Sequence, residues 1–329
     1  MAHLLNMKEP AGKLECPVCG SPSFEPTPQV IDLRRVLERW QIEADITLRD
    51  SVWREYKEDM KSSIRLYRCS TCRAQMFMPP VSGSEDFYAD ITAKEYYVAE
   101  KWEFYQAARD IERYKRKKVL DIGCGNGYFL SLLSSRVKHI GCVGYEFNSV
   151  MADMARGKGH TVYTGRFPEA VLGSDGKAEF DAVCLFQVLE HLSDPMGFLR
   201  DVCRAMIPGG LLFVGVPDAE GPLRFFPYAL TDIPPHHVTR WSRETFRRGL
   251  RGLGLEFVKA AYEPLPHYLW QSYLPPIIEQ RFPSLRRADT FIRGRLTSAV
   301  ISLMKTIGIK WLHGVRGHTL YVVLRFGKD

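Results

Sequence analysis

The chain has 329 residues, of which 45% are hydrophobic and 25% charged, a composition that excludes long-range disorder and a fibrous repeat. At roughly 100–200 residues per domain, this length favours two domains or one large domain with appendages. The formal net charge of +7 is too small to indicate nucleic-acid binding by itself. It would suit an anionic partner if the basic side chains were concentrated in one segment.

The N-terminal sequence and the cysteines bear on where the protein works. No stretch reaches the roughly 18 apolar residues that a membrane-spanning helix requires, and the opening MAHLLNMKEPAGKLECP lacks a basic cluster followed by an apolar run. We therefore expect a cytoplasmic protein. Four of the eight cysteines lie in Cys-x-x-Cys pairs, which favours metal binding or buried thiols over disulfides.

Residues 1–80 contain both pairs, Cys16 with Cys19 and Cys69 with Cys72. Each pair can place two thiolates on one tetrahedral ion, and four sulfur ligands leave no open position for catalysis, so we predict a structural Zn²⁺. The segment between the pairs is longer than the roughly 15–20 residues usual in such sites, which predicts a helical insertion. A redox dithiol and unliganded thiols are the alternatives.

Two helical segments are expected around the second cysteine pair. Apolar residues recur at helical spacing between about Val30 and Met60, namely Leu33, Val36, Leu37 and Trp40. A turn-rich run from Pro79 to Ser84 then ends the N-terminal region, and an aromatic segment from Phe87 to Tyr114 is expected to be helical. We therefore interpret residues 1–80 as a zinc-ribbon-like domain with a helical insertion and residues 81–117 as a connecting helical segment.

From residue 118 onward, short apolar runs alternate with longer amphipathic stretches, a pattern that predicts an α/β fold with a parallel sheet. The expected strands are Val119–Ile122, Ile140–Tyr145, Ala182–Phe186, Leu211–Val216, Leu255–Ala261 and His318–Phe326. The expected helices are Gly127–Arg136, Ser149–Lys158, Pro195–Met206 and Arg243–Gly252. Ser242 should cap the last of these helices, with Thr245 at the capping-box position.

The run from Val119 to Tyr128, VLDIGCGNGY, is the most informative in the chain. A hydrophobic strand ends in Asp121, and Gly123, Gly125 and Gly127 follow at alternate positions. Glycines at such a turn let the backbone approach a ligand that side chains would block. The nicotinamide-nucleotide fingerprint spaces its glycines Gly-x-Gly-x-x-Gly instead, so the third glycine comes one residue early here.

This strand, acidic residue and Gly-x-Gly-x-Gly turn resemble the first motif of the class I S-adenosylmethionine-dependent methyltransferases. The later runs GCVGYEFN, FDAVCLFQVLEHLSDP and PGGLLFVGVPD look like that family's second, fourth and fifth strands. The resemblance covers Lys118 to Tyr262. It implies a Rossmann-like seven-stranded sheet with helices on both faces, S-adenosyl-L-methionine as cofactor, and a methyltransferase domain at residues 118–329.

The resemblance also implies a set of cofactor-binding residues. The glycine loop should pass under the methionine part, a carboxylate after the second strand should hold the ribose, two aromatic residues and a cation should flank the adenine, and the end of the fourth strand should contact the methionine. These residues are Asp121, Gly123, Cys124, Gly125, Gly127 and Tyr128 at the loop, Glu146 at the ribose, Phe147, Arg166 and Phe167 at the adenine, and Phe186 and Gln187 at the methionine. Core packing is the alternative for Phe147 and Phe167.

Three histidines are candidates for work on the acceptor. Methyl transfer to a hydroxyl or an activated carbon benefits from a base near neutral pKa, and histidine is the natural choice. His191 follows the fourth strand, and His236 and His237 follow the fifth, so all leave the carboxyl edge of the sheet. We favour His236 or His237; the alternative is that each histidine only bonds a loop carbonyl. The metal-dependent ubiquinone-pathway O-methyltransferases have a glutamate where this chain has Gln187, so the resemblance does not imply a catalytic divalent ion.

Residues 263–317 are expected to form a basic helical insertion before the last strand. They carry eight basic and three acidic side chains, so this segment holds +5 of the net charge. A helix is expected from about Ala288 to Ile307, with one apolar stripe formed by Ile292, Leu296, Ala299, Val300, Leu303 and Ile307. A substrate cap, a dimer contact, peripheral membrane contact through residues 286–307 and simple packing on the domain all remain open.

The Pro-Pro-His-His run resembles bacterial methyltransferases that modify natural products and polysaccharides, and the Cys-Pro-x-Cys-Gly knuckle resembles zinc-ribbon segments that precede such domains. We therefore predict methyl transfer to an anionic small-molecule or glycan-linked acceptor, such as a nucleotide sugar, a saccharide or a natural-product intermediate. An RNA methyltransferase that uses the zinc ribbon to hold nucleic acid is the alternative. A cofactor-binding scaffold without catalysis is the second alternative.

Overall fold

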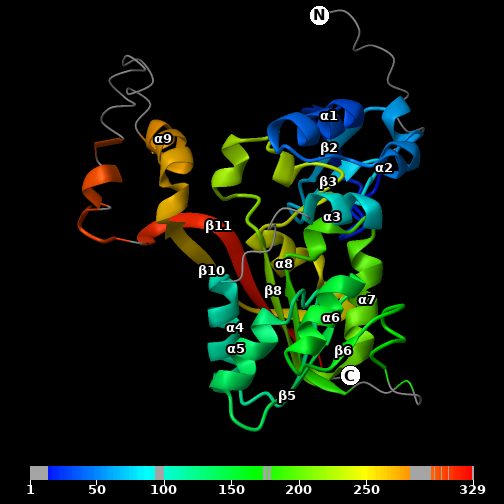
Figure 1. Ribbon diagram of the computed structural model, residues 1–329, viewed down its shortest axis with the longest axis vertical. Helices are drawn as coiled ribbons and strands as arrows, with labels where there is room; N and C mark the ends of the chain where they lie inside the picture. Colours follow the sequence, from blue (N-terminus) through cyan, green and yellow to red (C-terminus); the bar gives the residue numbers. More distant parts are fainter. Residues whose placement is uncertain are drawn as a thin grey trace, which may run out of the picture.

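The structure is a computed structural model that describes residues 14–92, 100–172, 176, 179–281, 298–299, 301–304, 306–309 and 311–327. Two sheets organise it (Figure 1). A seven-stranded sheet has the order β10-β11-β8-β7-β4-β5-β6, and a four-stranded sheet has the order β1-β2-β3-β9. The four neighbouring pairs from β8 to β6 are parallel, whereas β11 runs antiparallel to both β8 and β10. The prediction of an α/β sheet of seven strands is confirmed.

The strands of the large sheet are β4 Lys118–Ile122, β5 Gly141–Tyr145, β6 Val162–Tyr163, β7 Phe180–Phe186, β8 Met206–Pro217, β10 Leu255–Pro266 and β11 Trp311–Phe326. Those of the small sheet are β1 Phe24–Ile31, β2 Ile64–Cys69, β3 Gln75–Met78 and β9 Thr239–Arg240. The helices are α1 Leu33–Glu43, α2 Asp50–Glu55, α3 Glu85–Thr92, α4 Trp102–Arg113, α5 Tyr128–Arg136, α6 Ser149–Gly157, α7 Pro195–Ala205, α8 Arg243–Gly249 and α9 Trp270–Arg281.

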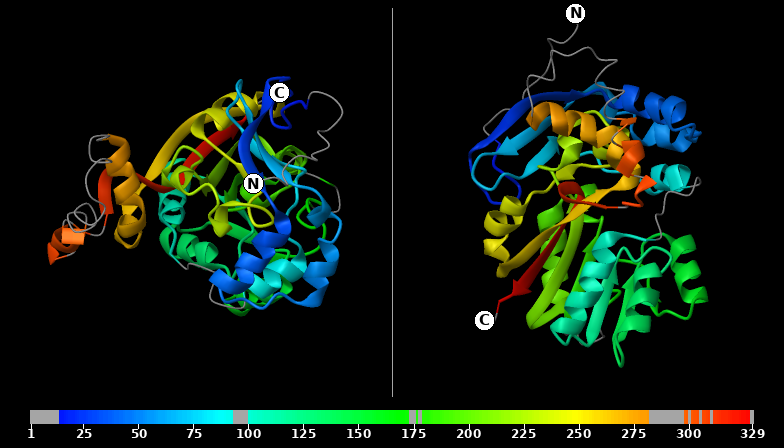
Figure 2. Two further views of the ribbon diagram at one scale, coloured as in Figure 1. Left: turned by 90° about the horizontal axis from the view of Figure 1, so that it is seen from above. Right: turned by 90° about the vertical axis from the view of Figure 1, so that its left-hand side faces the viewer.

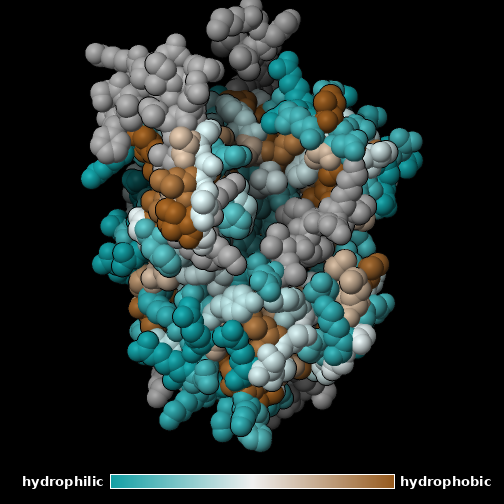
Figure 3. Space-filling view, turned by 60° about the vertical axis from the view of Figure 1, so that its left-hand side comes forward, coloured by the Kyte–Doolittle hydropathy of each residue, from teal (hydrophilic) through white to brown (hydrophobic). Residues whose placement is uncertain are grey.

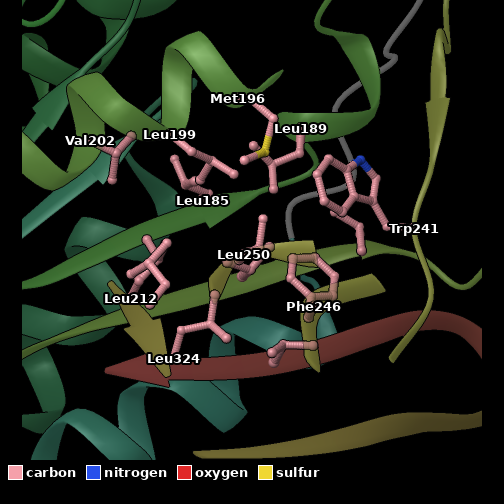
Figure 4. Close-up of a cluster of buried hydrophobic side chains, with 14 of the residues drawn as sticks. Leu185, Leu189, Met196, Leu199, Val202, Leu212, Trp241, Phe246, Leu250 and Leu324 are labelled. Carbon is pink, nitrogen blue, oxygen red and sulfur yellow. The ribbon is translucent and has the colours of Figure 1, made fainter. Parts of the chain in front are cut away.

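Helices cover both faces of the large sheet because side chains alternate along its buried strands. Leu120 and Leu185 belong to the core on the face where α7 and α8 pack. Figure 4 shows Leu199 of α7 beside Leu185, and Phe246 of α8 beside Leu250. Val119 lies on the opposite face, with the apolar residues of α4 and α5. The Ser242 capping box of α8 forms with Thr245 as predicted.

The N-terminal region confirms the expected helical insertion between the cysteine pairs. Helix α1 buries Leu33, Val36, Leu37 and Trp40 in a second core. Its small sheet is completed by β9, which belongs to the segment after β8 and pairs with β3 through Met76 and Thr239. The two regions therefore share a sheet, and the division of the chain near residue 80 stays a prediction.

The segment before the last strand differs from the expectation in extent. Instead of ending near Ala261, β10 continues to Pro266, and β11 begins at Trp311, because the two strands pair along most of that length. Residues 267–310 lie between them, and α9 stands out to one side when the molecule is seen from above (Figure 2, left). Most of the helix expected from Ala288 to Ile307 lies outside the described residues. In the part of the chain that is described, no helix is long and apolar enough to cross a membrane.

Candidate active site

The glycine loop joins β4 to α5 at the carboxyl edge of the large sheet. Gly123, Gly125 and Gly127 have φ angles of 76°, 52° and 77°, a left-handed conformation that glycine adopts without strain. The N–H groups of Gly123 and Cys124 donate to the carbonyl of Tyr145 at 2.8 and 3.2 Å, which ties the loop to the end of β5. A Cβ on Gly123 would lie 2.8 Å from Val188, so the sequence leaves room here for close approach of the backbone only.

Glu146 follows β5 and reaches across to the same loop. Its Oε2 accepts from the N–H of Gly125 at 2.8 Å, and its Oε1 accepts from the N–H of Asn148 at 2.9 Å. The side chain is 4% exposed, and burial raises the pKa of its carboxyl, whereas the backbone donors oppose that shift. Each carboxylate oxygen still has a second lone pair for a ligand hydroxyl. The geometry therefore fits a ribose held between the loop and Glu146.

Asp121 lies at the end of β4, beneath the loop, and is 2% exposed. Burial, together with the negative charge of Glu146, raises the pKa of its carboxyl to about 8. Two buried carboxyl groups side by side make this end of the sheet favourable for a ligand that brings positive charge or hydroxyl donors.

The other residues expected around the cofactor lie in two environments. Phe147 is 55% exposed beside Glu146, and Tyr128 opens α5 next to the loop, with its hydroxyl 3.3 Å from that of Tyr105. Phe167, in contrast, packs against Tyr145 and Phe198 with ring centroids 5.3 and 5.2 Å away. Phe167 therefore packs on the core, whereas Phe147 is exposed, and contact of either ring with the adenine stays a prediction.

Arg166 extends into solvent and has a weak ion pair with Glu169 at 3.8 Å. At the end of β7, Phe186 is 5% exposed and packs against aromatic residues of α4 and α5. Gln187 has a φ of 58°, and its Nε2 donates to Glu103 of α4 at 3.0 Å. Glu103 is buried next to this turn, and nothing in its local sequence marks it as a site residue.

The three candidate histidines form one cluster. The rings of His191, His236 and His237 have centroids 4.5–4.8 Å apart, and their nearest nitrogens lie within 4.8 Å of one another. Two segments that are remote in the sequence and leave the same edge of the sheet thus bring their histidines together. The rings of His236 and His237 stack at 17°. Because a metal ion lies in the plane of each imidazole that binds it, these two rings would have to turn before they could share an ion.

Hydrogen bonds fix two of the histidines. Nδ1 of His191 lies 2.7 Å from the carbonyl oxygen of His236 and 2.9 Å from the hydroxyl of Tyr88. A carbonyl can only accept, so Nδ1 carries the proton and Nε2 is left as an acceptor. Nδ1 of His237 lies 3.4 Å from Asp232, which also pairs with Arg240 at 2.8 Å. Burial lowers the pKa of His191 to about 4 and lowers the pKa values of the other two well below the usual range, so all three are neutral at pH 7.

Glu190, the neighbour of His191, was missed as a site residue. It is 1% exposed, and neither carboxyl oxygen has a hydrogen-bond partner among the described residues. Burial raises the pKa of this carboxyl to about 8. Tyr88 of α3 was also missed, although its ring contacts His191 and Phe147 and so connects the histidines to the exposed aromatic beside Glu146. The sequence signals were weak: Glu190 is the neighbour of a candidate histidine, and Tyr88 lies in the aromatic segment that was expected to be helical.

The four cysteines of the N-terminal region converge on one point. The Sγ atoms of Cys16 and Cys72 are 3.7 Å apart, as are those of Cys19 and Cys69, and all four lie within 4.8 Å of one another. Four thiolates about 2.3 Å from a tetrahedral Zn²⁺ would be about 3.8 Å apart. None of the four is in a disulfide. The donor set and its spacing therefore fit the structural Zn²⁺ that the sequence predicts.

Comparisons with known proteins agree with this geometry. A family model described as a methyltransferase domain matches residues 99–260. A probable S-adenosylmethionine-dependent methyltransferase of Mycobacterium tuberculosis is 30% identical over 149 residues, 45% of this chain and 52% of the relative. A ubiquinone biosynthesis O-methyltransferase of Parvibaculum lavamentivorans is 30% identical over 112 residues, 32% of this chain and 43% of the relative.

A solved SAM-dependent methyltransferase from Thermotoga maritima aligns with 72% of this chain and 94% of its own, at 17% identity and a TM-score of 0.47. The chain spans about half the length of the first curated relatives that it matches. The matched segment contains the glycine loop, Glu146 and the end of β7, and the sheet that carries them has seven strands with β11 antiparallel. Residues 99–260 therefore form a domain of the class I S-adenosylmethionine-dependent methyltransferase superfamily.

Proposed function

We propose that the protein transfers a methyl group from S-adenosyl-L-methionine to a small-molecule or glycan-linked acceptor, with a histidine of the cluster as the base. The observation that carries this proposal is that the glycine loop with Glu146 and the histidine cluster occupy the same edge of one sheet, joined through Tyr88 and Phe147. Ligands bind at this edge in open α/β folds. S-adenosyl-L-methionine supplies a methyl group that its sulfonium has already activated.

The residues of the chain would hold the cofactor and remove the proton of the acceptor. Glu146 and the backbone of Gly123 to Gly127 would hold the nucleoside and the amino-acid part of the cofactor. Gln187, fixed by its bond to Glu103, would border the reacting methyl. Placement of the two reactants in line accounts for most of the acceleration such a transfer requires.

His191 is the member of the cluster best arranged to receive the acceptor proton. It is partly exposed, whereas His236 and His237 are 1% and 6% exposed. Its Nδ1 is engaged with the carbonyl of His236, so Nε2 can accept a proton from a hydroxyl or an activated carbon. His237 with Asp232 would stabilise the charge that develops nearby, because Asp232 already bonds the Nδ1 side of that ring.

Incubation with methyl-labelled cofactor tests the proposal against its alternatives. We expect label in sugar nucleotides, saccharides or small molecules of a cell extract, and loss of that label in a His191→Asn variant that still binds S-adenosylhomocysteine. Transfer to RNA alone would refute the acceptor class. Tight cofactor binding without transfer to any fraction would instead identify a scaffold. A His139→Asn variant is the matched control, because His139 lies in the turn between α5 and β5.

A further inference from the structure

A large cavity lies where the small sheet faces the segments that follow β8. Its volume is about 920 Å³, and its lining residues come from β1, β2, β3 and β9, from the loop after β8, and from α9 and the start of β11. Neither the glycine loop nor the histidines line it. Asp232 does, and the same side chain contacts His237. In the space-filling view, hydrophilic residues line a hollow in the middle of one face of the molecule (Figure 3).

The cavity is lined by five arginines, Arg68, Arg73, Arg224, Arg240 and Arg316, and by three acidic residues, Asp218, Glu220 and Asp232. Two of the arginines are neutralised by the protein itself. Arg240 pairs with Asp232 at 2.8 Å and donates to Gln29 at 3.1 Å. Arg316 lies 3.6 Å from Asp218 and stacks on Tyr262, with 3.8 Å between the guanidinium and the ring centre.

The other three guanidinium groups lack a tight ion pair among the described residues. Arg68 has no ion pair among the described residues, and its buried Nε has no hydrogen-bond partner there. Arg224 donates to the carbonyls of Glu220 and Gly221 and to the side-chain oxygen of Gln280, all of which are neutral acceptors. Arg73 lies 3.8 Å from Glu220, and both side chains are about 40% exposed, so this contact is weak.

These three arginines act on one region because they come from neighbouring segments. Arg68 lies on β2, Arg73 follows the second cysteine pair, and Arg224 lies in the short helix Pro222–Phe225 after β8. Burial, together with the positive charge of Arg73, lowers the pKa of Arg68, whereas the negative charge of Glu220 opposes that shift. Arg68 and Arg73 are partly buried, whereas Arg224 is exposed. Like charges that line one cavity favour an anion between them, and guanidinium groups match phosphate oxygens in two-point hydrogen bonds.

We propose that this cavity binds the phosphate or diphosphate ester of the methyl acceptor, an assignment that rests on the proposed function and deepens it. An inorganic anion would fill a small part of the volume, so the ligand carries an organic group as well. The N-terminal region then has a direct part in acceptor binding, because it supplies Arg68 and Arg73. This places the anion-binding surface at the small sheet and the loop after β8.

Calorimetric titration of the full chain with uridine diphosphate and with inorganic pyrophosphate tests the assignment. We expect uridine diphosphate to bind, and Arg68→Gln or Arg224→Gln to weaken it by about tenfold or more, since each removes a charged donor. Arg224 is exposed, so its variant keeps the test valid if Arg68→Gln does not fold. Arg251→Gln is the matched control, because Arg251 is exposed outside the cavity.

The outcomes separate this assignment from the proposed function, because the diphosphate titration requires no cofactor. No binding of uridine diphosphate at millimolar concentration, or binding that neither cavity variant changes, would overturn the assignment. Pyrophosphate binding as tightly as uridine diphosphate would also overturn it, because the cavity would then be an inorganic-anion site. S-adenosylhomocysteine affinity should be equal in the wild type and all three variants. If the wild type does not bind S-adenosylhomocysteine, the methyltransferase proposal is refuted instead.

Discussion

Replacement of Glu146 by glutamine tests the cofactor site most sharply, because it keeps the size of the side chain. Both oxygens of Glu146 accept from backbone N–H groups, at 2.8 Å from Gly125 and 2.9 Å from Asn148. A glutamine has one acceptor oxygen and one NH₂ group, so in either orientation one of these N–H groups faces another donor. An unsatisfied buried donor costs about 1–3 kcal/mol, and the ribose also loses a charged acceptor worth about 1.5–3 kcal/mol.

The unsatisfied backbone donor is present in the free protein as well as in the complex, so its cost largely cancels in binding. Only the lost contact with the ribose enters the binding constant in full. We therefore expect Glu146→Gln to weaken S-adenosylhomocysteine binding by roughly 10–100-fold. Isothermal titration calorimetry measures this directly, and Glu256→Gln, an exposed change on β10, is the control. Unchanged affinity in Glu146→Gln would refute the placement of the ribose at this carboxylate.

Three further predictions follow from the buried groups. His191 is neutral above its lowered pKa of about 4, so the turnover rate should stay level from pH 8 to about pH 5 and fall below that. His191→Asn should lower the turnover rate by about 10²–10⁴-fold. A fall in the turnover rate of the wild type between pH 7 and pH 6 would exclude His191 as the base. Because the folded-state pKa of Glu190 is raised to about 8, the stability that its protonated form contributes is present below the unfolded pKa near 4.5 and is lost as pH rises towards 8. The free energy of unfolding of Glu190→Gln, measured in urea, should therefore rise relative to that of the wild type by up to about 1.4 kcal/mol per pH unit between these two values. An equal difference between variant and wild type at pH 5 and at pH 8 would contradict this. Metal analysis of the wild type should find one Zn²⁺ per chain, and Cys16→Ser should lower both the zinc content and the Tm. A wild type that contains no zinc and has the same Tm as Cys16→Ser would show that the cysteines are unliganded thiols.

Local sequence patterns were sufficient to predict the large sheet. Strands such as Ala182–Phe186 are continuous apolar runs because they are buried on both faces, and the glycine turn is required by a left-handed backbone. The Ser242 and Thr245 cap also depends on neighbours in the sequence alone. The glycine turn and the helix cap were therefore predicted nearly to the residue. By contrast, β6 was not among the expected strands, and β8 and β11 begin earlier than expected, at Met206 and Trp311.

Features that depend on contacts between distant segments were not predicted from the sequence. The pairing of β9 with β3 joins Thr239 to Met76, and a two-residue strand has no periodicity to reveal it. Glu103 and Tyr88 lie on helices whose sequences are explained by packing, and their role appears only where they meet Gln187 and His191. The five arginines of the cavity likewise come from separate segments, so the net charge of each segment did not reveal them.

A crystal structure with S-adenosylhomocysteine tests the central claim most directly. We predict that both ribose hydroxyls lie within hydrogen-bond distance of Glu146 and that the sulfur faces Gln187 and His191. The claim would be contradicted by a ligand bound elsewhere on the chain, or by a sulfur directed away from the histidine cluster.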